Sequence, residues 1–306
     1  MDIKNSKPEW IKTQFQPSKT EFVHSLLHDL KLNTVCQSAN CPNLGECFQR
    51  QTATFMVLGK ICTHRCPYCD VPFGRPETID PDEPEKIAIA VRELKLKHVV
   101  VTSVCRDDLP DGGAEHFRRV IDAVHRDCPG TTVEVLIPDF KGNVMALNRV
   151  LDSMPEVLNH NVETVPELYK QVRPQGVYQN SLAVLRRSRE FAEAKGIGYP
   201  VVKTGVMLGL GETDEQVYSL FADLLEHGCE VLTLGQYLRP SPAHLPVVRY
   251  LKPSEFDAYR QRALEMGFAY VAASSLVRSS YRAETALAEV LKQKSCNCEE
   301  GCVCSF

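Results

Sequence analysis

Short apolar runs alternate with amphipathic stretches along most of the chain. The apolar runs are rich in Val, Ile, Leu and Thr and are bounded by Gly, Pro or Asp, as buried parallel strands tend to be. We predict strands at residues 54–60, 98–104, 131–137, 157–163, 200–208 and 230–238. The stretches between them predict helices near residues 84–95, 114–127, 143–153, 179–195 and 214–227, the last with a cap at 212–215.

Six strand-then-helix units predict a parallel sheet with right-handed crossovers. We therefore expect an α/β fold, a partial or closed (β/α) barrel of about six parallel strands with N- and C-terminal extensions. A doubly wound open sheet is the alternative, and in either architecture the functional groups gather at the carboxyl ends of the strands. By residue number, we expect an N-terminal extension (1–50), a barrel core (51–250), a C-terminal extension (251–294) and a cysteine-rich tail (295–306).

The charge balance excludes some classes of partner. The 306 residues include 35 Lys and Arg against 39 Asp and Glu, which gives a formal net charge of −4. This weakly acidic chain lacks the basic character that is typical of nucleic-acid-binding proteins, so we expect no nucleic-acid partner. No apolar run approaches the roughly 18 residues of a membrane span, and the start of the chain does not resemble a signal peptide. We therefore expect a cytoplasmic protein with no membrane partner.

Cysteine is the residue type that changes the picture most. The chain contains 13 cysteines, and in a reducing compartment such thiols serve metals or catalysis rather than disulfides. Cys105, Cys128 and Cys229 stand apart, and the other ten fall into three groups. The first group is Cys36, Cys41 and Cys47, the second is Cys62, Cys66 and Cys69, and the third is Cys296, Cys298, Cys302 and Cys304.

The second group directly follows the first predicted strand and is spaced C-x3-C-x2-C. Three thiolates on one tight loop can each hold one iron of a cubane [4Fe–4S] cluster, which leaves the fourth iron open for another ligand. The alternative is a zinc knuckle completed by His64, because structural zinc takes four ligands. The spacing and the position after a strand favour the cluster.

This spacing, with Tyr68 before the last cysteine, resembles the signature of the radical S-adenosylmethionine (SAM) superfamily. That resemblance implies that SAM binds the open iron and is cleaved to a 5′-deoxyadenosyl radical. The C-x4-C-x5-C spacing of the first group makes the resemblance more specific. Together with LGKICTHRCPYCDV, TSVCRDDLPDGGAEHF, NHNVETV, VRP, the GLGET loop and RSSY, it resembles the lipoyl synthase family, over roughly Pro8 to Glu289.

The resemblance implies a second, auxiliary [4Fe–4S] cluster on Cys36, Cys41 and Cys47, with Ser280 of RSSY as its fourth ligand. Serine oxygen is a harder ligand than thiolate sulfur and should hold iron less durably, which suits a cluster that is dismantled in use. Arg278 would steady the negative charge that develops on this cluster.

The implied enzyme is a sulfurtransferase of lipoate biosynthesis and protein lipoylation. It inserts two sulfur atoms at C6 and C8 of a protein-bound octanoyl-lysine to form the lipoyl cofactor, with the auxiliary cluster as sulfur donor. Unactivated carbons offer no acidity and no leaving group, which is the difficulty that radical hydrogen abstraction answers. The implied partners are octanoylated lipoyl-carrier domains (2-oxoacid dehydrogenase E2 subunits and the glycine cleavage H protein), a reducing electron donor (flavodoxin or ferredoxin) and an iron–sulfur carrier that reloads the auxiliary cluster.

The same resemblance implies a SAM pocket. Asn161 and Glu163 end the fourth predicted strand two residues apart, hence on one face, where they can reach polar groups of the cofactor. Glycines in the GLGET loop would let the backbone approach the adenosine closely. The full set of expected SAM-binding residues is Tyr68, Asn161, Glu163, Arg173, Lys203, Gly209, Gly211 and Glu212.

The sequence departs from the family pattern at two places. Cys105 stands where the family has an acidic or amide side chain, and we interpret it as a small buried hydrophobic residue. The tail carries C-x-C-x3-C-x-C from Cys296, which either binds a soft metal or hands over a cluster, or has no catalytic duty. Two other functions stay open: a non-catalytic iron–sulfur carrier, and another radical SAM sulfur-inserting enzyme of the biotin synthase type.

Overall fold

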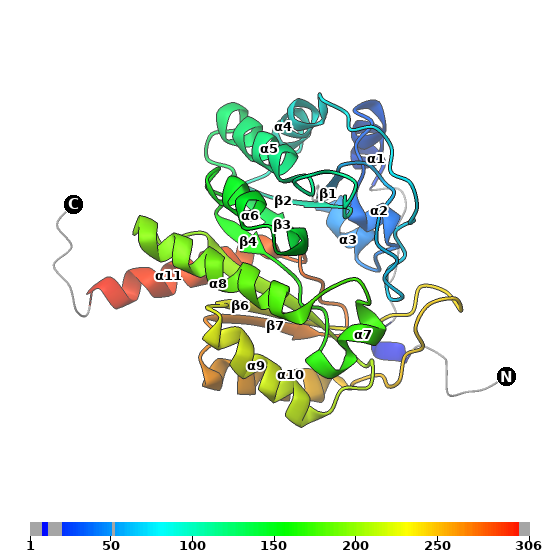
Figure 1. The fold of residues 1–306 in the computed structure, drawn as a ribbon, viewed down its shortest axis with the longest axis vertical. Helices are drawn as coiled ribbons and strands as arrows, with labels where there is room; N and C mark the ends of the chain where they lie inside the picture. The colour runs from blue at the N-terminus through cyan, green and yellow to red at the C-terminus, as the bar shows by residue number, and fades with distance from the viewer. Residues whose placement is uncertain (1–7, 12–19, 51–52, 300–306) are drawn as a thin grey trace.

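The fold is that of a computed structural model, which describes residues 8–11, 20–50 and 53–299 and, for 296–299, the backbone alone (Figure 1). Seven strands form one sheet in which neighbours in sequence are neighbours in space, and every pairing is parallel. The strands are β1 (Thr54–Val57), β2 (His98–Ser103), β3 (Thr132–Leu136), β4 (Val157–Asn159), β5 (Val201–Leu208), β6 (Val231–Gln236) and β7 (Tyr270–Ser274).

This strand order confirms a partial barrel. Among the described strands, β1 pairs only with β2 and β7 only with β6, so the sheet curls without closing; the other edge of β1 makes a single antiparallel bridge, between Phe55 and Thr34. A doubly wound sheet would reverse its strand order at a switch point, and this one does not. The sheet has one strand more than the six runs that we predicted, because the apolar run near residue 270 pairs with β6 beyond the expected end of the core.

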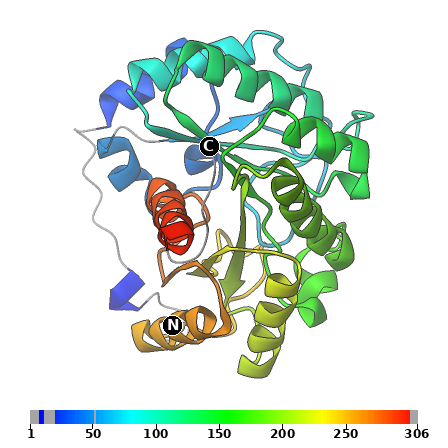
Figure 2. The same ribbon diagram turned by 90° about the vertical axis from the view of Figure 1, so that its left-hand side faces the viewer.

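A ring of helices covers the outer face of the sheet (Figure 2). All five predicted helices are confirmed, because their apolar positions recur at helical spacing and pack against the strands. The predicted cap of the last one is present: Thr213 accepts from the Gln216 amide while the Gln216 side chain accepts from the Thr213 amide. The helices of the barrel are α4 (Glu83–Glu93), α5 (Ala114–Asp127), α6 (Val144–Leu151), α7 (Tyr169–Val172), α8 (Tyr178–Lys195), α9 (Asp214–Glu226) and α10 (Pro253–Met266).

Both extensions lie on the open side of the barrel. The N-terminal extension forms the 3-10 helix η2 (Glu9–Ile11), whose Trp10 donates to the Leu251 carbonyl, and helices α1 (Glu21–Asp29), α2 (Val35–Ser38) and α3 (Leu44–Gln49). These three helices lie near β1 (Figure 1). The C-terminal extension ends in α11 (Ala283–Glu299). Buried side chains of α11, among them Leu287, pack against Val157, Val201 and Val231, the first residues of three strands. Helix α11 therefore plugs the amino end of the barrel (red in Figure 2).

The barrel interior contains a buried ion pair. The Lys203 ammonium donates to both carboxylate oxygens of Glu134, at 2.9 and 3.0 Å, and the two side chains are 1% and 0% exposed. Asn159 Nδ2 donates to the same carboxylate at 3.1 Å, and His98 Nε2 lies 3.6 Å from its other oxygen.

Within the described residues, no helix is long and apolar enough to span a membrane.

Candidate functional site

The second cysteine group lies where it was predicted, in the loop that leaves the carboxyl end of β1. Leu58 and Gly59 both have positive φ, of 68° and 94°, so the chain turns sharply there before it reaches Cys62. The Cys62 amide donates to the Pro72 carbonyl and the Gly74 amide donates back to Cys62. These contacts close the loop on itself, so that its three thiols share a small region.

The three thiols of this loop are electrostatically unequal. The Cys62 sulfur accepts hydrogen bonds from the amides of His64 and Cys105, both at 3.3 Å. A hydrogen bond from the Cys105 thiol, with these amides, lowers the pKa of Cys62 to about 6. Burial raises the pKa of Cys66 to about 11 and that of Cys69 to about 12. The loop therefore favours the thiolate form of Cys62. A metal that binds here must supply the free energy to deprotonate Cys66 and Cys69.

The structure speaks against the zinc alternative for this loop. His64 is buried, and its Nε2 lies within hydrogen-bond distance, 2.9 Å, of a carboxylate oxygen of Asp107. This nitrogen is therefore already engaged and is not directed at the three thiols. Among the residues that the structure describes, no three His, Cys, Asp or Glu side chains are arranged to hold a single metal ion. Three thiols without a fourth protein ligand match a cluster that keeps one iron open.

The fourth strand is shorter than the predicted 157–163, because β4 ends at Asn159, so Asn161 and Glu163 lie together beyond its end rather than within it. Glu163 has a φ of 69°, and its backbone continues the pairing with β5, donating to the Gly205 carbonyl at 3.0 Å. Burial raises the pKa of the Glu163 carboxyl, while Arg173 and hydrogen bonds from Asn161 and Tyr68 oppose this shift. Oδ1 of Asn161 is buried and accepts no hydrogen bond. A buried acceptor without a donor fits a site that receives a ligand with N–H or O–H groups.

Arg173 also belongs to this cluster. Its Nη1 donates to the Asn161 carbonyl at 2.9 Å, to the Tyr169 hydroxyl at 3.0 Å and to Ser181 Oγ at 3.2 Å. Its charge opposes the rise in the pKa of the Cys66 thiol that burial causes. Arg173 therefore links the cysteine loop to the end of β4 as a buried cation that is anchored to the protein through Nη1.

Three other expected SAM-binding residues have partners within the protein. Lys203 is held in the ion pair with Glu134. The Glu212 carboxylate accepts from the amides of Gly209 and Leu210, at 2.6 and 2.9 Å, and so shapes its own loop. At Gly209 a Cβ atom would lie 2.2 Å from Gln236 Nε2, so the close approach there is to the protein.

Gly211 has a different environment. It has a φ of 118°, and a Cβ atom there would meet only a methyl group of Val248, at 3.7 Å. Its positive φ explains why glycine stands at this position, and the space beside it stays open. Of the two glycines, Gly211 therefore fits the expected close approach of a ligand better.

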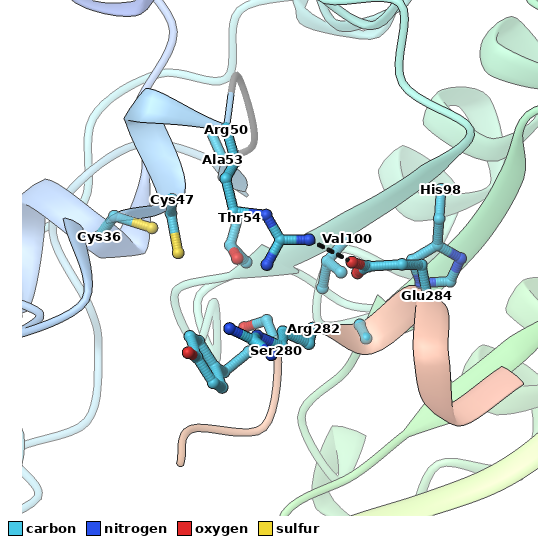
Figure 3. A pocket seen from close by; sticks show the side chains of 12 residues that line it. Cys36, Cys47, Arg50, Ala53, Thr54, His98, Val100, Ser280, Arg282 and Glu284 are labelled. Carbon is cyan, nitrogen blue, oxygen red and sulfur yellow. Dashed lines mark hydrogen bonds and ion pairs between the residues drawn. The ribbon is translucent and has the colours of Figure 1, made fainter. Parts of the chain in front are cut away.

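The first cysteine group meets the RSSY segment in a pocket of about 470 Å³ that opens to solvent (Figure 3). Cys36 of α2, Cys47 of α3 and Ser280 all line it. Burial, together with the neighbouring thiols, raises the pKa of Cys36 to about 11 and that of Cys47 to about 12. Cys41 does not line the pocket, but its charge acts on both. Two thiols and a hydroxyl at one opening fit the donor set predicted for the auxiliary cluster.

Contacts between the two ends of the chain hold this pocket together. The Asn43 side chain donates to the Leu276 carbonyl at 2.7 Å. The Tyr281 hydroxyl donates to both oxygens of Glu46, at 3.0 Å each. On the other side of the pocket Arg50 pairs with Glu284 at 2.9 Å (Figure 3). Helix α3 and the segment that leads into α11 are therefore fastened to each other around the pocket.

Arg278 lies beside the first cysteine group. Burial lowers the pKa of its guanidinium, and the charge of Cys41 opposes that shift. Its Nη1 donates to the Val277 carbonyl at 2.6 Å. At Gly235 of β6 a Cβ atom would lie 2.2 Å from the Val277 oxygen, so glycine is needed there for the segment to pass.

The loops of the two cysteine groups also touch directly. Asn40 Nδ2, beside Cys41, donates to Oδ2 of Asp70, beside Cys69, at 2.5 Å. The His244 ring lies 3.1 Å from the Cys69 carbonyl oxygen, so the loop after β6 also supports this corner. Sequence reasoning missed His244 because it lies in a polar loop far along the chain.

The interpretation of Cys105 as a small buried hydrophobic residue is wrong. This residue is only half-buried, and its backbone amide donates to the Cys62 sulfur at 3.3 Å, so it lies against the second cysteine group. Its position just after the second predicted strand, at the same edge of the sheet as Cys62, was a signal that could have predicted this contact.

The four tail cysteines lie outside the residues whose side chains the structure describes, so the tail hypothesis stays a prediction.

Comparisons with known proteins agree with this geometry. The family model described as "Radical SAM superfamily" matches residues 56–224. A lipoyl synthase of Syntrophotalea carbinolica is 51% identical over 291 residues, covering 94% of this chain and 92% of its own. One of Caldanaerobacter subterraneus subsp. tengcongensis is 49% identical, covering 92% of this chain and 97% of its own.

A solved structure supports the fold. Streptococcus suis SuiB, crystallised with S-adenosylmethionine, superposes with a TM-score of 0.51 at 8% identity, over 76% of this chain and 53% of SuiB. At this identity the likeness shows the fold alone, whereas the sequence matches are close to 50% over nearly the full length of both chains. The chain belongs to the lipoyl synthase family of radical SAM enzymes, whose cofactors are SAM and two [4Fe–4S] clusters.

Proposed function

We propose that this protein inserts sulfur at C6 and C8 of a protein-bound octanoyl-lysine through the residues of the two cysteine groups and the RSSY segment. The observation that carries the proposal is the position of two consecutive serines. Ser279 Oγ lies 3.4 Å from Asn161 Nδ2, while Ser280 lines the pocket of the first cysteine group. The RSSY segment thus contacts both the end of β4 and the pocket of the first cysteine group. Such proximity is required by a reaction in which a radical formed at one site is followed by sulfur transfer at the other.

Each site has its own ligands in this proposal. Cys62, Cys66 and Cys69 hold the cluster with the open iron, and Cys36, Cys41, Cys47 and Ser280 hold the auxiliary cluster. When bound, the first cluster and SAM supply a 5′-deoxyadenosyl radical, and the auxiliary cluster supplies sulfur. The protein's part is to hold both groups in place and to keep water from the space between them.

The residues at the end of β4 orient SAM. The unpartnered Oδ1 of Asn161 is available to accept from an N–H or O–H group of the cofactor. Glu163 offers a half-buried carboxylate, and Tyr68 and Arg173 hold this corner through the contacts described above. Gly211 leaves room for the adenosine.

The RSSY segment serves the auxiliary cluster. A serine oxygen holds iron less durably than a thiolate, so Ser280 is the ligand that can leave as the cluster is consumed. Arg278, whose charge is close to Cys41, stabilises the added negative charge.

The finer choice of partners follows from the family. We propose octanoylated domains of 2-oxoacid dehydrogenase E2 subunits and the glycine cleavage H protein as substrates, flavodoxin or ferredoxin as electron donor, and an iron–sulfur carrier for reloading. The cytoplasm is the proposed location, because these partners and reduced thiols occur there.

The test is a mass measurement on a small substrate. The protein is reconstituted with iron and sulfide without oxygen and incubated with an octanoyl-lysyl peptide, SAM and reductant. We expect the peptide to gain the mass of two sulfur atoms, with formation of 5′-deoxyadenosine. A reduced protein that does not cleave SAM is an iron–sulfur carrier and contradicts the proposal.

Variants separate the two sites. Cys66→Ala should abolish both SAM cleavage and product, whereas Ser280→Ala or Cys47→Ala should leave SAM cleavage partly intact and abolish lipoyl product. Cys128→Ala is the matched control, because this buried thiol donates to the Ala88 carbonyl on the outer helices. Product from a protein without the first cysteine group would show that the auxiliary site is not the sulfur source.

A further inference from the structure

Leu58 has an unfavourable backbone conformation at the exit of β1. Its φ of 68° belongs to the left-handed region, which is unfavourable for any residue other than glycine. Cys62 follows in the same loop, so the direction in which the chain leaves Leu58 determines where the second cysteine group begins. Such a conformation persists only where the surrounding structure fixes it.

Helix α4 holds the amide side of Leu58. The Leu58 amide donates to Oε2 of Glu83 at 2.9 Å, and Nε2 of His116 lies 2.7 Å from the same oxygen. Both Glu83 and His116 are buried. A hydrogen bond from a buried amide to a carboxylate is a strong one, and its loss leaves the amide without a partner.

The segment after β2 holds the carbonyl side of Leu58. Nη1 of Arg106 donates to the Leu58 oxygen at 2.9 Å, while Nε and Nη2 donate to the two oxygens of Asp108, at 2.9 and 2.8 Å. At Gly113 a Cβ atom would lie 2.2 Å from Cδ1 of Leu58, so the leucine side chain packs directly against that backbone. Four of these residues belong to TSVCRDDLPDGGAEHF, to which the proposed function gives no role: Arg106, Asp108, Gly113 and His116.

We propose that Glu83 and Arg106 are positioning residues that hold the two peptide groups of Leu58 and thereby keep the loop of the second cysteine group in the conformation that binds its cluster. The inference rests on the proposed function, which assigns the SAM-binding cluster to this loop. Neither residue is a ligand of iron. When one of the two bonds is lost, the turn at Leu58 relaxes toward negative φ, and the loop opens more often.

The test is the rate at which a chelator strips iron from each cluster of the full chain. Samples taken during chelation are reduced and measured by electron paramagnetic resonance, in which the signal that changes when SAM is added belongs to the cluster with the open iron. Glu83→Ala removes the charged acceptor of the Leu58 amide and should raise the stripping rate of this cluster about tenfold. The auxiliary cluster should lose iron at an unchanged rate.

Glu156 offers a matched control at the amino end of the barrel. Its Oε2 also accepts from a backbone amide, that of Val133 at 2.7 Å, and lies 3.4 Å from Nε2 of His125. Glu156→Ala should make urea unfolding of the cluster-free protein easier, as Glu83→Ala does, and should leave both stripping rates unchanged. Glu83→Gln keeps an oxygen for the Leu58 amide and should stay within about threefold of the unaltered rate.

A second variant acts on the other peptide group. Where Glu83→Ala does not fold, Arg106→Met removes the donor to the Leu58 carbonyl and carries the same expectation. The other partner of Arg106, Asp108, is exposed, so this change leaves no buried charge without a partner.

The comparison between the two clusters decides the inference. An unchanged stripping rate in both Glu83→Ala and Arg106→Met overturns it. Equal acceleration at both clusters, or an equal acceleration in Glu156→Ala, also overturns it, because these residues would then serve only the stability of the whole fold. A protein without any SAM-dependent signal instead contradicts the proposed function, so the two failures are distinguishable.

Discussion

Replacing Lys203 by methionine tests whether this residue serves the fold or the cofactor. The substitution keeps the length of the side chain but leaves the Glu134 carboxylate in the barrel interior without its ammonium partner. Removing one partner of a buried ion pair costs about 3–5 kcal/mol, because the other charge stays desolvated. We therefore expect Lys203→Met to lower the free energy of unfolding by that amount.

The charge environment of Glu134 gives a second estimate. Burial alone would raise the pKa of this carboxyl, but the Lys203 ammonium and His98 outweigh it and hold the pKa at about 2, against an ordinary value of 4.5. At about 1.36 kcal/mol per pKa unit, the difference corresponds to roughly 3 kcal/mol. Because the folded-state pKa is the lower one, this stabilisation is complete above pH 4.5 and is lost as the pH falls through about 2.

The assay is urea denaturation of the cluster-free protein at neutral pH, followed by circular dichroism. The double variant Lys203→Met/Glu134→Gln removes both charges and keeps an acceptor for Asn159, so it should recover at least half of the loss. A single variant that unfolds within about 1 kcal/mol of the unaltered protein would refute the reasoning. SAM cleavage is then measured on the double variant: if the fold recovers and cleavage does not, Lys203 binds the cofactor.

Three other perturbations have defined outcomes. Glu212→Ala removes a buried carboxylate that accepts from two amides of its own loop, so it should cost about 1.5–3 kcal/mol in urea unfolding and weaken SAM binding in calorimetry. Asn43→Ala removes the bond to the Leu276 carbonyl, and a chelator should then strip iron from the auxiliary cluster faster, at an unchanged rate for the other cluster. Hydrogen bonding to Glu156 raises the pKa of His125, so this pair stabilises the fold fully below pH 6.5 and loses its effect as the pH rises through the higher folded-state value. Urea unfolding against pH should show that decline in the unaltered protein and lack it in Glu156→Gln.

The sequence predicted the repeating units well because each is a local pattern. A strand such as 200–208 is apolar over its whole length, and Thr213 with Gln216 marks the start of its helix by two side chains alone. The seventh strand was not counted, because its short apolar run becomes a strand only by pairing with β6. Whether a barrel closes depends in the same way on contacts between residues far apart in the chain.

The candidate site shows the same division. The spacing of a cysteine group is local, so both groups were found, and the structure brings Ser280 to the pocket of the first. The roles of Lys203 and Cys105 were not readable, because each is decided by one partner: Glu134 lies two strands away, and Cys62 lies in another loop. A lone cation or thiol in a sequence carries no sign of which partner it will meet.

The pocket shared by Cys36, Cys47 and Ser280 sets an order of events during synthesis. The ribosome delivers the chain from its N-terminus, so the loop with Cys62, Cys66 and Cys69 is complete long before Ser280 has left the exit tunnel. The pocket of the first cysteine group cannot form until some 230 residues after Cys47 have been synthesised, because Ser280 and its neighbours complete its lining. A truncated translation product would therefore lack the residues that complete this pocket, and we expect a cluster to be held there only after the polypeptide has been made and folded through residue 284.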